Sequence, residues 1–418
     1  MTKRMFAVAI SGVLGFPLLA AADSSSVQIY GTLLPFLDNA RTSSATAPGL
    51  SPANGGASQV PAAAYTGITS PGRNRITAGT SNIGFRGSED LSDGLKAIFQ
   101  VESQIPIDGD PAPPGTWAGR NSNVGLAGGF GTVFLGNWDT PYKWTTIAVS
   151  PLRGLNPFDY DNILENPGFN VPGTTTQSGR VNGKADAAFS RRQGNSVQYW
   201  TPNWSGFFAR VAYSANEGKT AIPGGANISP SIWSVSVAYE QGPLVLRYAY
   251  EQHDDYFGMA QLGGSPGATA TNSSSKDKAN KLVGIYIVGG TRIAAVYERL
   301  QYDTEDLSIG AANKYKRDAY YLQVQQRFGA SNVWAGYGQA KDGHCERIGG
   351  AGCTTDGLSA KMWSLGYSYD LSKRTNLYAA YYGVNTDQSS SYGIFPAPGV
   401  VTPGANSRGL GVGILHSF

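Results

Sequence analysis

Several features that common protein classes depend on are scarce in this sequence. Apart from the N-terminal residues, no apolar run approaches the roughly 20 residues that a membrane-spanning helix needs. Charged residues make up only 15% of the chain, and no dense basic cluster is present that would follow a nucleic-acid backbone. No segment has a sustained apolar stripe of helical period. These absences exclude a helical membrane protein, a nucleic-acid-binding protein and a helical bundle.

Cysteine and histidine are also scarce, which argues against a metal site. The two cysteines, Cys345 and Cys353, lie in a glycine-rich stretch, and a disulfide between them is the ordinary expectation in an oxidising compartment. A zinc site would need four ligands, and among the histidines His344 alone lies beside the pair. We therefore expect no metal and no cofactor.

Two glycine-rich motifs have the letters of catalytic or phosphate-binding loops without their context. Residues 263–267 match a nucleophile elbow, but proline follows the serine and no helix pattern comes after it. Residues 125–131 lack the Lys-Ser/Thr ending of a phosphate loop and continue into a strand pattern. The sequence therefore does not predict an enzyme.

The N-terminus has the layout of a secretory signal peptide. Lys3 and Arg4 precede an almost wholly apolar run, 5–19, and three alanines follow it. An anchor helix is the alternative, but the run is shorter than a membrane span needs and is interrupted by a proline. We expect residues 1–22 to be removed and residues 23–418 to form one domain outside the cytoplasm.

Most of the remaining chain alternates between apolar and polar residues, as strands do when one face is apolar and the other is wet. In the segment 94–104 the odd-numbered residues are mostly apolar, whereas the even-numbered residues include Lys96, Gln100 and Glu102. Sixteen segments follow such a pattern: 27–37, 75–87, 94–104, 120–128, 131–138, 194–201, 206–215, 231–240, 243–252, 279–288, 291–302, 315–328, 331–341, 360–370, 374–384 and 406–418.

Short and long connections alternate between these segments. The short ones are 88–93, 128–129, 202–205, 241–242, 289–290, 329–330 and 371–373. The long ones are 38–74, 105–119, 139–193, 216–230, 253–278, 303–314, 342–359 and 385–405. This alternation is typical of an up-and-down antiparallel barrel with an even number of strands. A soluble sandwich would not require every second connection to be short, and its interior would be more apolar.

The two faces of the segments indicate a barrel that spans a membrane. Hydrocarbon offers no hydrogen-bond partners, so a spanning sheet must close on itself and present apolar side chains to lipid. We therefore predict an all-β fold, a 16-stranded antiparallel transmembrane β-barrel. Aromatic residues near the short connections suit an interfacial girdle, although they are also good strand residues; they are Tyr199, Trp200, Trp204, Tyr239, Phe328, Tyr367, Tyr369 and Phe418.

Blocks spread over the whole mature chain resemble the general bacterial porins of the Gram-negative type. The matching blocks are 26–31 (first strand), 83–91 and 94–102 (second and third strands), 124–136 (fourth and fifth strands), 195–207 (sixth strand and its turn) and 413–418 (last strand with its terminal Phe). The second-strand block and the C-terminal block together are highly specific for that family.

The resemblance implies a trimeric porin of the cell outer membrane. Such a barrel has short periplasmic turns and long extracellular loops, and ions and small hydrophilic solutes diffuse through its water-filled pore. Its partners would be two further copies of the chain, outer-membrane lipid and lipopolysaccharide, and the barrel-assembly machinery, which would read Phe418 as a signal. The resemblance also implies that the third loop, here 139–193, folds into the lumen.

A pore constriction is implied between basic wall residues and acids of the loop 139–193. The basic candidates are Arg86, Arg120, Arg191, Arg192, Arg210 and Arg247, and the acidic ones are Asp159, Asp161 and Glu165. We also expect Tyr30, Lys96, Gln100 and Glu102 to line the lumen. Asn82, Asn137 and Leu415 stand where the family often carries basic residues, so we expect weak ion selectivity.

Two other classes of function are compatible with a barrel. An outer-membrane barrel enzyme, such as a protease or phospholipase, would need a Ser/His/Asp-type cluster near its mouth. A barrel used for adhesion or anchoring would have a plugged lumen. Conductance in a planar bilayer separates both from a porin.

Overall fold

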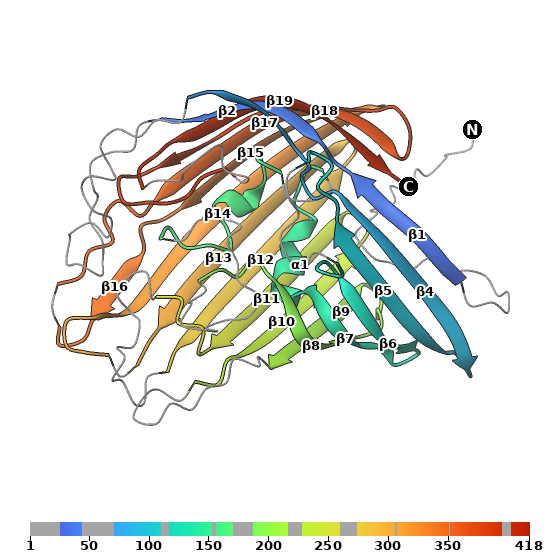
Figure 1. Ribbon diagram of the computed structural model, residues 1–418, viewed down its shortest axis with the longest axis horizontal. Helices are drawn as coiled ribbons and strands as arrows, with labels where there is room; N and C mark the ends of the chain where they lie inside the picture. The colour runs from blue at the N-terminus through green and yellow to red at the C-terminus, as the bar shows by residue number, and fades with distance from the viewer. Residues whose placement is uncertain are drawn as a thin grey trace.

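The computed structural model describes the chain from residue 26 to residue 418, with gaps at 44–70, 110–116, 153–155, 170–186, 216–227, 260–273, 306, 351 and 395–402. The expected signal peptide, 1–22, lies outside the described residues. The described strands form one antiparallel sheet that closes into a barrel (Figure 1). In chain order the strands are β1 (Ser26–Leu33), β2 (Phe36–Thr42), β3 (Arg73–Thr77), β4 (Asn82–Ser92), β5 (Leu95–Gln104), β6 (Ser122–Gly128), β7 (Gly131–Asp139), β8 (Arg192–Trp200), β9 (Phe207–Ala215), β10 (Ser231–Gln241), β11 (Leu244–Asp254), β12 (Lys276–Val288), β13 (Thr291–Asp303), β14 (Ala312–Phe328), β15 (Ser331–Ala340), β16 (His344–Arg347), β17 (Ala360–Asp370), β18 (Thr375–Thr386) and β19 (Ser407–Ser417).

The 19 strands of the described chain make 16 spans of the barrel wall. Three spans consist of two strands each, namely β1 and β2, β3 and β4, and β15 and β16. The two strands of each pair lie beside the same neighbouring span of the wall. Every segment predicted from the alternating pattern overlaps one of these spans. The predicted 16-stranded antiparallel barrel is therefore confirmed.

The two ends of the described chain close the barrel. β1 pairs with β4 on one side and with β19 on the other. The amide of Phe418 donates to the carbonyl of Gly31, and the amide of Gly31 donates back, each over 3.1 Å. A side chain at residue 31 would lie 2.7 Å from the carbonyl oxygen of Asn82 and would also meet the Phe418 ring. Glycine therefore permits the close approach that closure requires.

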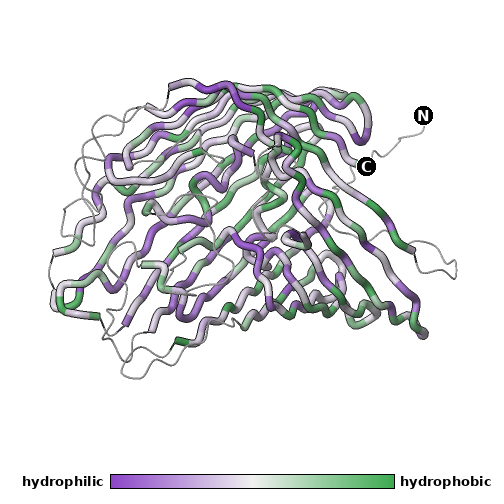
Figure 2. Tube along the Cα trace, in the orientation of Figure 1, coloured by the Kyte–Doolittle hydropathy of each residue, from purple (hydrophilic) through white to green (hydrophobic). Residues whose placement is uncertain are grey.

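The alternation predicted from the sequence separates an apolar outer face from a polar inner face. On the outside, Leu282 and Leu410 expose 51% and 60% of their surface. On the inside, charged residues such as Lys281 and Glu298 are buried. Figure 2 shows the hydrophobic and hydrophilic residues alternating along the strands. An exposed belt of large apolar side chains around a polar interior is the arrangement that a membrane-spanning barrel needs.

The tight turns connect strands on one side of the barrel. Asp93 and Gly94, which join β4 to β5, both have positive φ, +48° and +78°. This is the backbone of a two-residue hairpin turn of the kind that favours Asp-Gly. The strand β4 continues to Ser92, so the predicted connection 88–93 was too long.

Two long loops were predicted without regular structure, and the structure corrects both. The first strand continues to Thr42 rather than ending before residue 38, because Asp38 points inward and forms an ion pair of 2.7 Å with Arg75. The loop 342–359 contains β16, which pairs with the extended β14.

The aromatic residues near the turns mostly face outward. Those that are substantially exposed are Tyr199, Trp204, Phe328, Tyr367, Tyr369 and Phe418. Trp200 was predicted to join them but faces the interior, where its ring contacts Phe134 and Trp138. Its neighbour Tyr199 occupies the outward position, since adjacent residues of a strand point to opposite faces.

Candidate functional site: the loop inside the barrel

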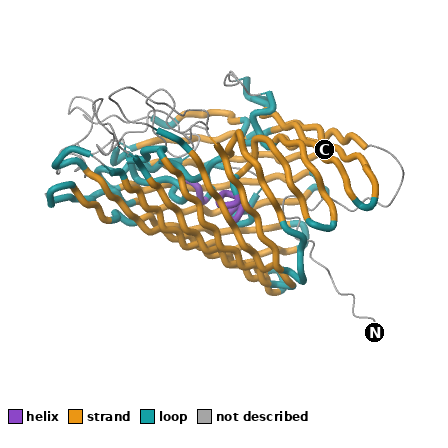
Figure 3. The backbone as a smooth tube through the Cα atoms, turned by 90° about the horizontal axis from the view of Figure 1, so that it is seen from below, coloured by secondary structure: helices purple, strands orange, loops and turns teal. Residues whose placement is uncertain are grey.

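The connection between β7 and β8 contains a short helix that lies within the ring of strands. This helix, α1 (Pro141–Ile147), is seen inside the barrel in Figure 1 and again in Figure 3. Thr140 caps it, accepting a hydrogen bond of 3.3 Å from the amide of Lys143, and Pro141 takes the first helical position. Among the described residues no helix is long and apolar enough to cross a membrane.

Arginines of the wall satisfy the carbonyl groups at the other end of α1. The last carbonyls of a helix have no partners within it. Arg247 on β11 donates to the carbonyls of Trp144 and Thr145 over 3.4 and 3.2 Å. Arg292 on β13 donates to the carbonyl of Ala148. The wall therefore holds the C-terminal end of α1.

The Trp144 ring of α1 lies between two arginines. The guanidinium groups of Arg210 and Arg247 lie 3.7 and 4.0 Å from its centroid. Arg210 also lies 4.1 Å from the centroid of the Trp200 ring. Planar guanidinium groups stack well on aromatic faces, and such contacts gain strength when they are shielded from water. Both arginines are almost fully buried, and Arg247 also forms an ion pair of 2.7 Å with Glu240 on β10.

A buried network of four charges fixes the loop beyond α1. Glu165 of the loop forms an ion pair with Lys281 on β12. Its backbone amide donates to Glu298 on β13 over 2.8 Å, and Glu298 is 3.0 Å from Arg317 on β14. The hydroxyl of Tyr142 donates to Glu298 over 2.8 Å. All four charged side chains have no exposed surface, and the two positive charges balance the two negative ones.

Asp159 and Asp161 lie at a single turn of 3₁₀ helix, η2 (Tyr160–Asn162). Both carboxyl groups are buried, and the hydroxyl of Ser150 donates to Asp159 over 2.7 Å. Burial raises the pKa of Asp159 well above its usual value, and the neighbouring Asp161 adds to this. Burial, and then the charge of Glu165, raise the pKa of Asp161 to about 7. At neutral pH Asp159 is therefore protonated, whereas Asp161 is partly ionised and titrates near this pH.

An aromatic contact fixes the loop to the opposite wall. The Phe158 ring lies 6.0 Å from Phe36 on β2, 5.6 Å from Trp334 on β15 and 6.2 Å from Tyr378 on β18. Helix α1, in contrast, contacts β10, β11 and β12. The described parts of the loop therefore contact both sides of the barrel wall, α1 on one side and Phe158 on the other.

Partly exposed charges gather on the wall formed by the first strands. Arg120 forms an ion pair of 2.5 Å with Glu102 on β5, and Tyr30 on β1 donates to Glu102 over 3.0 Å. Arg86 on β4 donates to Gln28 over 3.0 Å and lies over the Tyr30 ring. These arginines, unlike those under α1, keep part of their surface open.

A second open cluster surrounds Asp139 at the end of β7. Its carboxylate lies 3.3 Å from Arg192 and 3.2 Å from Lys143, and it accepts a hydrogen bond of 2.8 Å from Asn121. The side chains of Arg192 and Lys143 are 13% and 12% exposed. Basic groups therefore outnumber acids at this edge of the loop.

The remaining candidate residues have other surroundings. Arg191 is buried, donates to Gln193 over 2.8 Å and lies over the Tyr256 ring. Lys96 forms an ion pair of 2.9 Å with Asp90. This ion pair lies beside the tight turn, at the opposite end of β5 from Glu102. Gln100 faces inward and donates to the carbonyl of Asn121 over 2.8 Å.

A model of the Gram-negative porin family matches residues 7–389 of this chain. The chain belongs to that family. The porin is therefore an outer-membrane protein, and its family consists of channels and not of enzymes.

Curated relatives of the porin agree in length and are distant in sequence. It is 29% identical to outer membrane porin protein 32 of Delftia acidovorans over 351 residues, which are 82% of this chain and 85% of that one. It is 27% identical to the major outer membrane protein P.IA of Neisseria meningitidis serogroup B over 402 residues, or 90% and 92% of the two chains.

Solved structures share the fold. The anion-selective porin from Comamonas acidovorans superposes with a TM-score of 0.66 at 23% identity, and the match covers 94% of this chain and 100% of that one. OmpT of Vibrio cholerae superposes with a TM-score of 0.56 at 16% identity, and the match covers 95% of this chain and 99% of that one. At such identities the likeness concerns the barrel alone.

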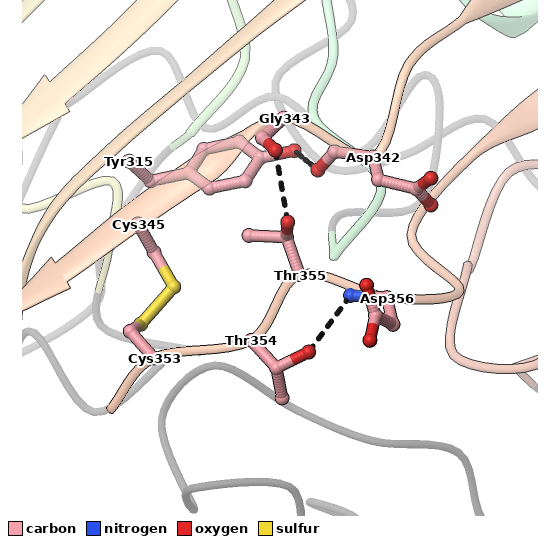
Figure 4. Close-up of a disulfide and its surroundings, with 8 residues drawn as sticks. All are labelled: Tyr315, Asp342, Gly343, Cys345, Cys353, Thr354, Thr355 and Asp356. Carbon is pink, nitrogen blue, oxygen red and sulfur yellow. Dashed lines mark hydrogen bonds between the residues drawn. A yellow bond between two sulfur atoms is a disulfide. The ribbon is translucent and has the colours of Figure 1, made fainter.

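The porin has a disulfide between Cys345 on β16 and Cys353, with a Cα–Cα distance of 5.8 Å (Figure 4). Nearby, the hydroxyl of Tyr315 on β14 donates to the carbonyl of Asp342 over 2.9 Å. Thr355 donates to the carbonyl of Gly343 over 2.9 Å. The disulfide and these hydrogen bonds hold the loop 342–359 against the extended end of β14.

Several residues that hold the loop were missed in the sequence. Lys281, Glu298 and Arg317 are inward-facing charges within long strands, where the inner neighbours include apolar residues such as Val283 and Ala319. A charge on the inner face beside apolar inner neighbours was a usable signal, because an inward charge in a membrane barrel needs a partner or water.

Proposed function

We propose that the porin allows passive diffusion of ions and small hydrophilic solutes through a water-filled lumen that the loop 139–193 narrows. The observation that carries this proposal is the loop itself, which is fixed to β11–β14 by buried charges and to β2, β15 and β18 by Phe158. A segment held at both ends across a polar lumen limits the size of what passes.

The charges around the open edge of the loop support a weak preference for anions. The side chains of Arg75, Arg120, Lys143 and Arg192 are partly exposed, and so is Arg86. They face three carboxylates, those of Asp38, Glu102 and Asp139, so five positive charges oppose three negative ones. A small positive excess at a narrow passage favours anions modestly. A structural relative of the porin is described as anion-selective, which agrees with this direction.

The proposed constriction divides the candidate residues into two roles. Arg86, Arg120 and Arg192 face the open passage, together with Lys143. Arg191, Arg210 and Arg247 and the acids Asp159, Asp161 and Glu165 are buried and hold the loop in place. Support for the second role comes from contacts described above: Arg210 and Arg247 lie against Trp144 of α1, and Glu165 pairs with Lys281. Asp159 and Asp161 are buried at η2, and Arg191 lies over the Tyr256 ring at the end of the loop.

A planar bilayer tests the proposal. Purified porin should give ohmic current steps, commonly in threes because we propose a homotrimer. In a salt gradient, the sign of the reversal potential should indicate that anions are preferred. A folded barrel without current steps would indicate a plugged lumen and would refute the proposal. We also propose that Phe418 is read by barrel-assembly machinery, which a Phe418→Ala variant with reduced membrane insertion would support.

A further inference from the structure

Arg210 on β9 is a buried cation whose hydrogen-bond donors the protein does not use. Its guanidinium group lies against the rings of Trp144 and Trp200, and the side chain is only 8% exposed. Within the part of the chain that the structure describes, it donates no hydrogen bond and forms no ion pair, and its nitrogen atoms are not sealed from the lumen. A guanidinium group has five donors, and leaving them unused in a buried place costs free energy. An acceptor that enters from the lumen would therefore be stabilised at Arg210.

A second unused polar group lies beside Arg210 on the next strand. Ser236 on β10 is directly opposite Arg210 in the strand register, and both side chains are on the inner face. The Ser236 hydroxyl is buried and has no hydrogen-bond partner among the described residues. A hydroxyl donates readily to an anionic oxygen, so one anion can accept hydrogen bonds from both side chains.

Aromatic rings surround these two groups. The Trp200 ring lies 5.7 Å from the Trp138 ring, and the Phe208 ring lies 5.7 Å from the Trp144 ring. Trp200 and Phe208 are only partly buried, so both keep some open surface. The indole Nε1 of Trp200 donates to Gln198 over 3.2 Å, which fixes the orientation of this ring. Apolar ring faces beside an unpaired cation suit a ligand that is both flat and anionic.

The rings and Arg210 lie on the tight-turn side of α1, apart from the open passage. Trp200 is the last residue of β8, and Phe208 follows the first residue of β9, so both are next to the short connection 202–205. Arg192, which faces the open passage, is at the other end of β8, roughly 26 Å along the strand. The charges of the passage and Arg210 are therefore two separate basic positions in the lumen.

We propose that Arg210 and Ser236, with the rings of Trp200 and Phe208, form a binding site for small aromatic monocarboxylates. The carboxylate accepts hydrogen bonds from the guanidinium group and the Ser236 hydroxyl, and the aromatic ring of the ligand lies against the two protein rings. A single negative charge fits best, because Glu240 already balances the neighbouring Arg247 over 2.7 Å and Arg210 alone is unpaired there. This site deepens the proposed function and rests on it, since the ligand reaches the site through the lumen.

Saturation-transfer NMR on the full-length porin in detergent, with sodium benzoate as the probe, measures binding without requiring current. Benzoate should bind saturably, and acetate should displace it poorly, because acetate has the carboxylate without the ring. Arg210→Gln should weaken benzoate binding by about tenfold or more, because it removes the charge and the paired donors.

Two milder variants keep the test independent of the loop, since R210Q also removes a contact with Trp144. R210K keeps the charge but not the planar pair of donors, and S236A removes a hydroxyl that has no partner in the described protein. Each should weaken benzoate binding by roughly threefold to tenfold. The matched control is R120Q, which removes one lumen charge at the open passage and should leave benzoate binding unchanged. Heat-modifiable migration in gels shows that each variant has folded.

Weaker binding in R210Q, R210K and S236A, with unchanged binding in the control, supports the site. Three results overturn it. An equal loss in R120Q would mean that benzoate responds to the overall positive charge of the lumen. Unchanged binding in both R210K and S236A would mean that neither group receives the carboxylate. Acetate that competes as well as unlabelled benzoate would mean that the rings take no part.

The planar bilayer separates this proposal from the proposed function. A porin that gives normal current steps but does not bind benzoate refutes the aromatic carboxylate site alone. A folded barrel that binds benzoate but gives no current steps refutes the proposed function and leaves the site in place.

Discussion

Replacing Lys281 by methionine tests the buried charge network that holds the loop. Methionine fills a similar volume but leaves Glu165 without its cation in a site with no exposed surface. Removing one partner of a buried pair costs about 3–5 kcal/mol, because the remaining charge is left without compensation. The lost contact between the ammonium group and the Tyr142 ring, 3.9 Å away, adds to the cost. We expect the loop to leave the wall or the barrel to unfold at lower urea concentration.

A double-mutant cycle combines this substitution with a second one, Glu165→Gln. The double variant K281M/E165Q has no unpaired charge at this point, so it should recover about 2 kcal/mol or more of the loss. Urea unfolding of the full-length porin in detergent micelles, followed by tryptophan fluorescence, measures the free energies, and single-channel noise reports loop detachment. Lys278→Met, on the outer face of the same strand, should change stability by less than about 0.5 kcal/mol. If K281M costs no more than this control, or if the double variant loses as much as K281M, the network does not hold the loop.

Three further predictions concern selectivity, pH and the disulfide. R120Q/R192Q removes two of the five partly exposed positive charges at the passage, so the reversal potential in a salt gradient should fall close to zero. An unchanged reversal potential would mean that these two arginines do not determine the ion selectivity. Asp161 has a pKa raised to about 7, so it ionises as pH rises through that value, and anion preference should fall between about pH 6 and pH 8 in the native porin but not in D161N. Because the pKa is raised, the stabilising contribution of neutral Asp161 is present in acid and lost as pH rises through about 7. Replacing Cys345 and Cys353 by serine should cost roughly 2–3 kcal/mol and should increase protease cleavage within 342–359, whereas equal cleavage rates would show that hydrogen bonds alone hold this loop.

The barrel was predictable from the sequence because its signal is repeated in every strand. A period of two, together with alternating turn lengths, determines both the number of strands and their topology. A single error, such as ending the first strand at residue 37 when it continues to Thr42, does not change that result. The turn between β4 and β5 was placed less well, because the predicted connection 88–93 did not use the Asp93-Gly94 pair, which favours a two-residue hairpin turn.

The interior of the loop was less predictable. Helix α1 has seven residues, too few to show a helical stripe, and its ends are satisfied by arginines distant in sequence. The sequence alone could not show which arginines face water, because Arg120 and Arg210 have the same chemistry. What separates them is Trp144, which covers Arg210 only after the loop has folded into the lumen.

The unequal lengths of the strands make the outer mouth of the barrel oblique. β14 has 17 residues and β6 has 7, so at a common tilt of about 45° they rise by roughly 40 Å and 17 Å. The taller side exceeds an apolar band of about 25 Å and ends where the disulfide joins β16 to its loop. A large particle that settles on the cell surface therefore touches this stiff rim first, whereas a small solute can approach sideways over the low side.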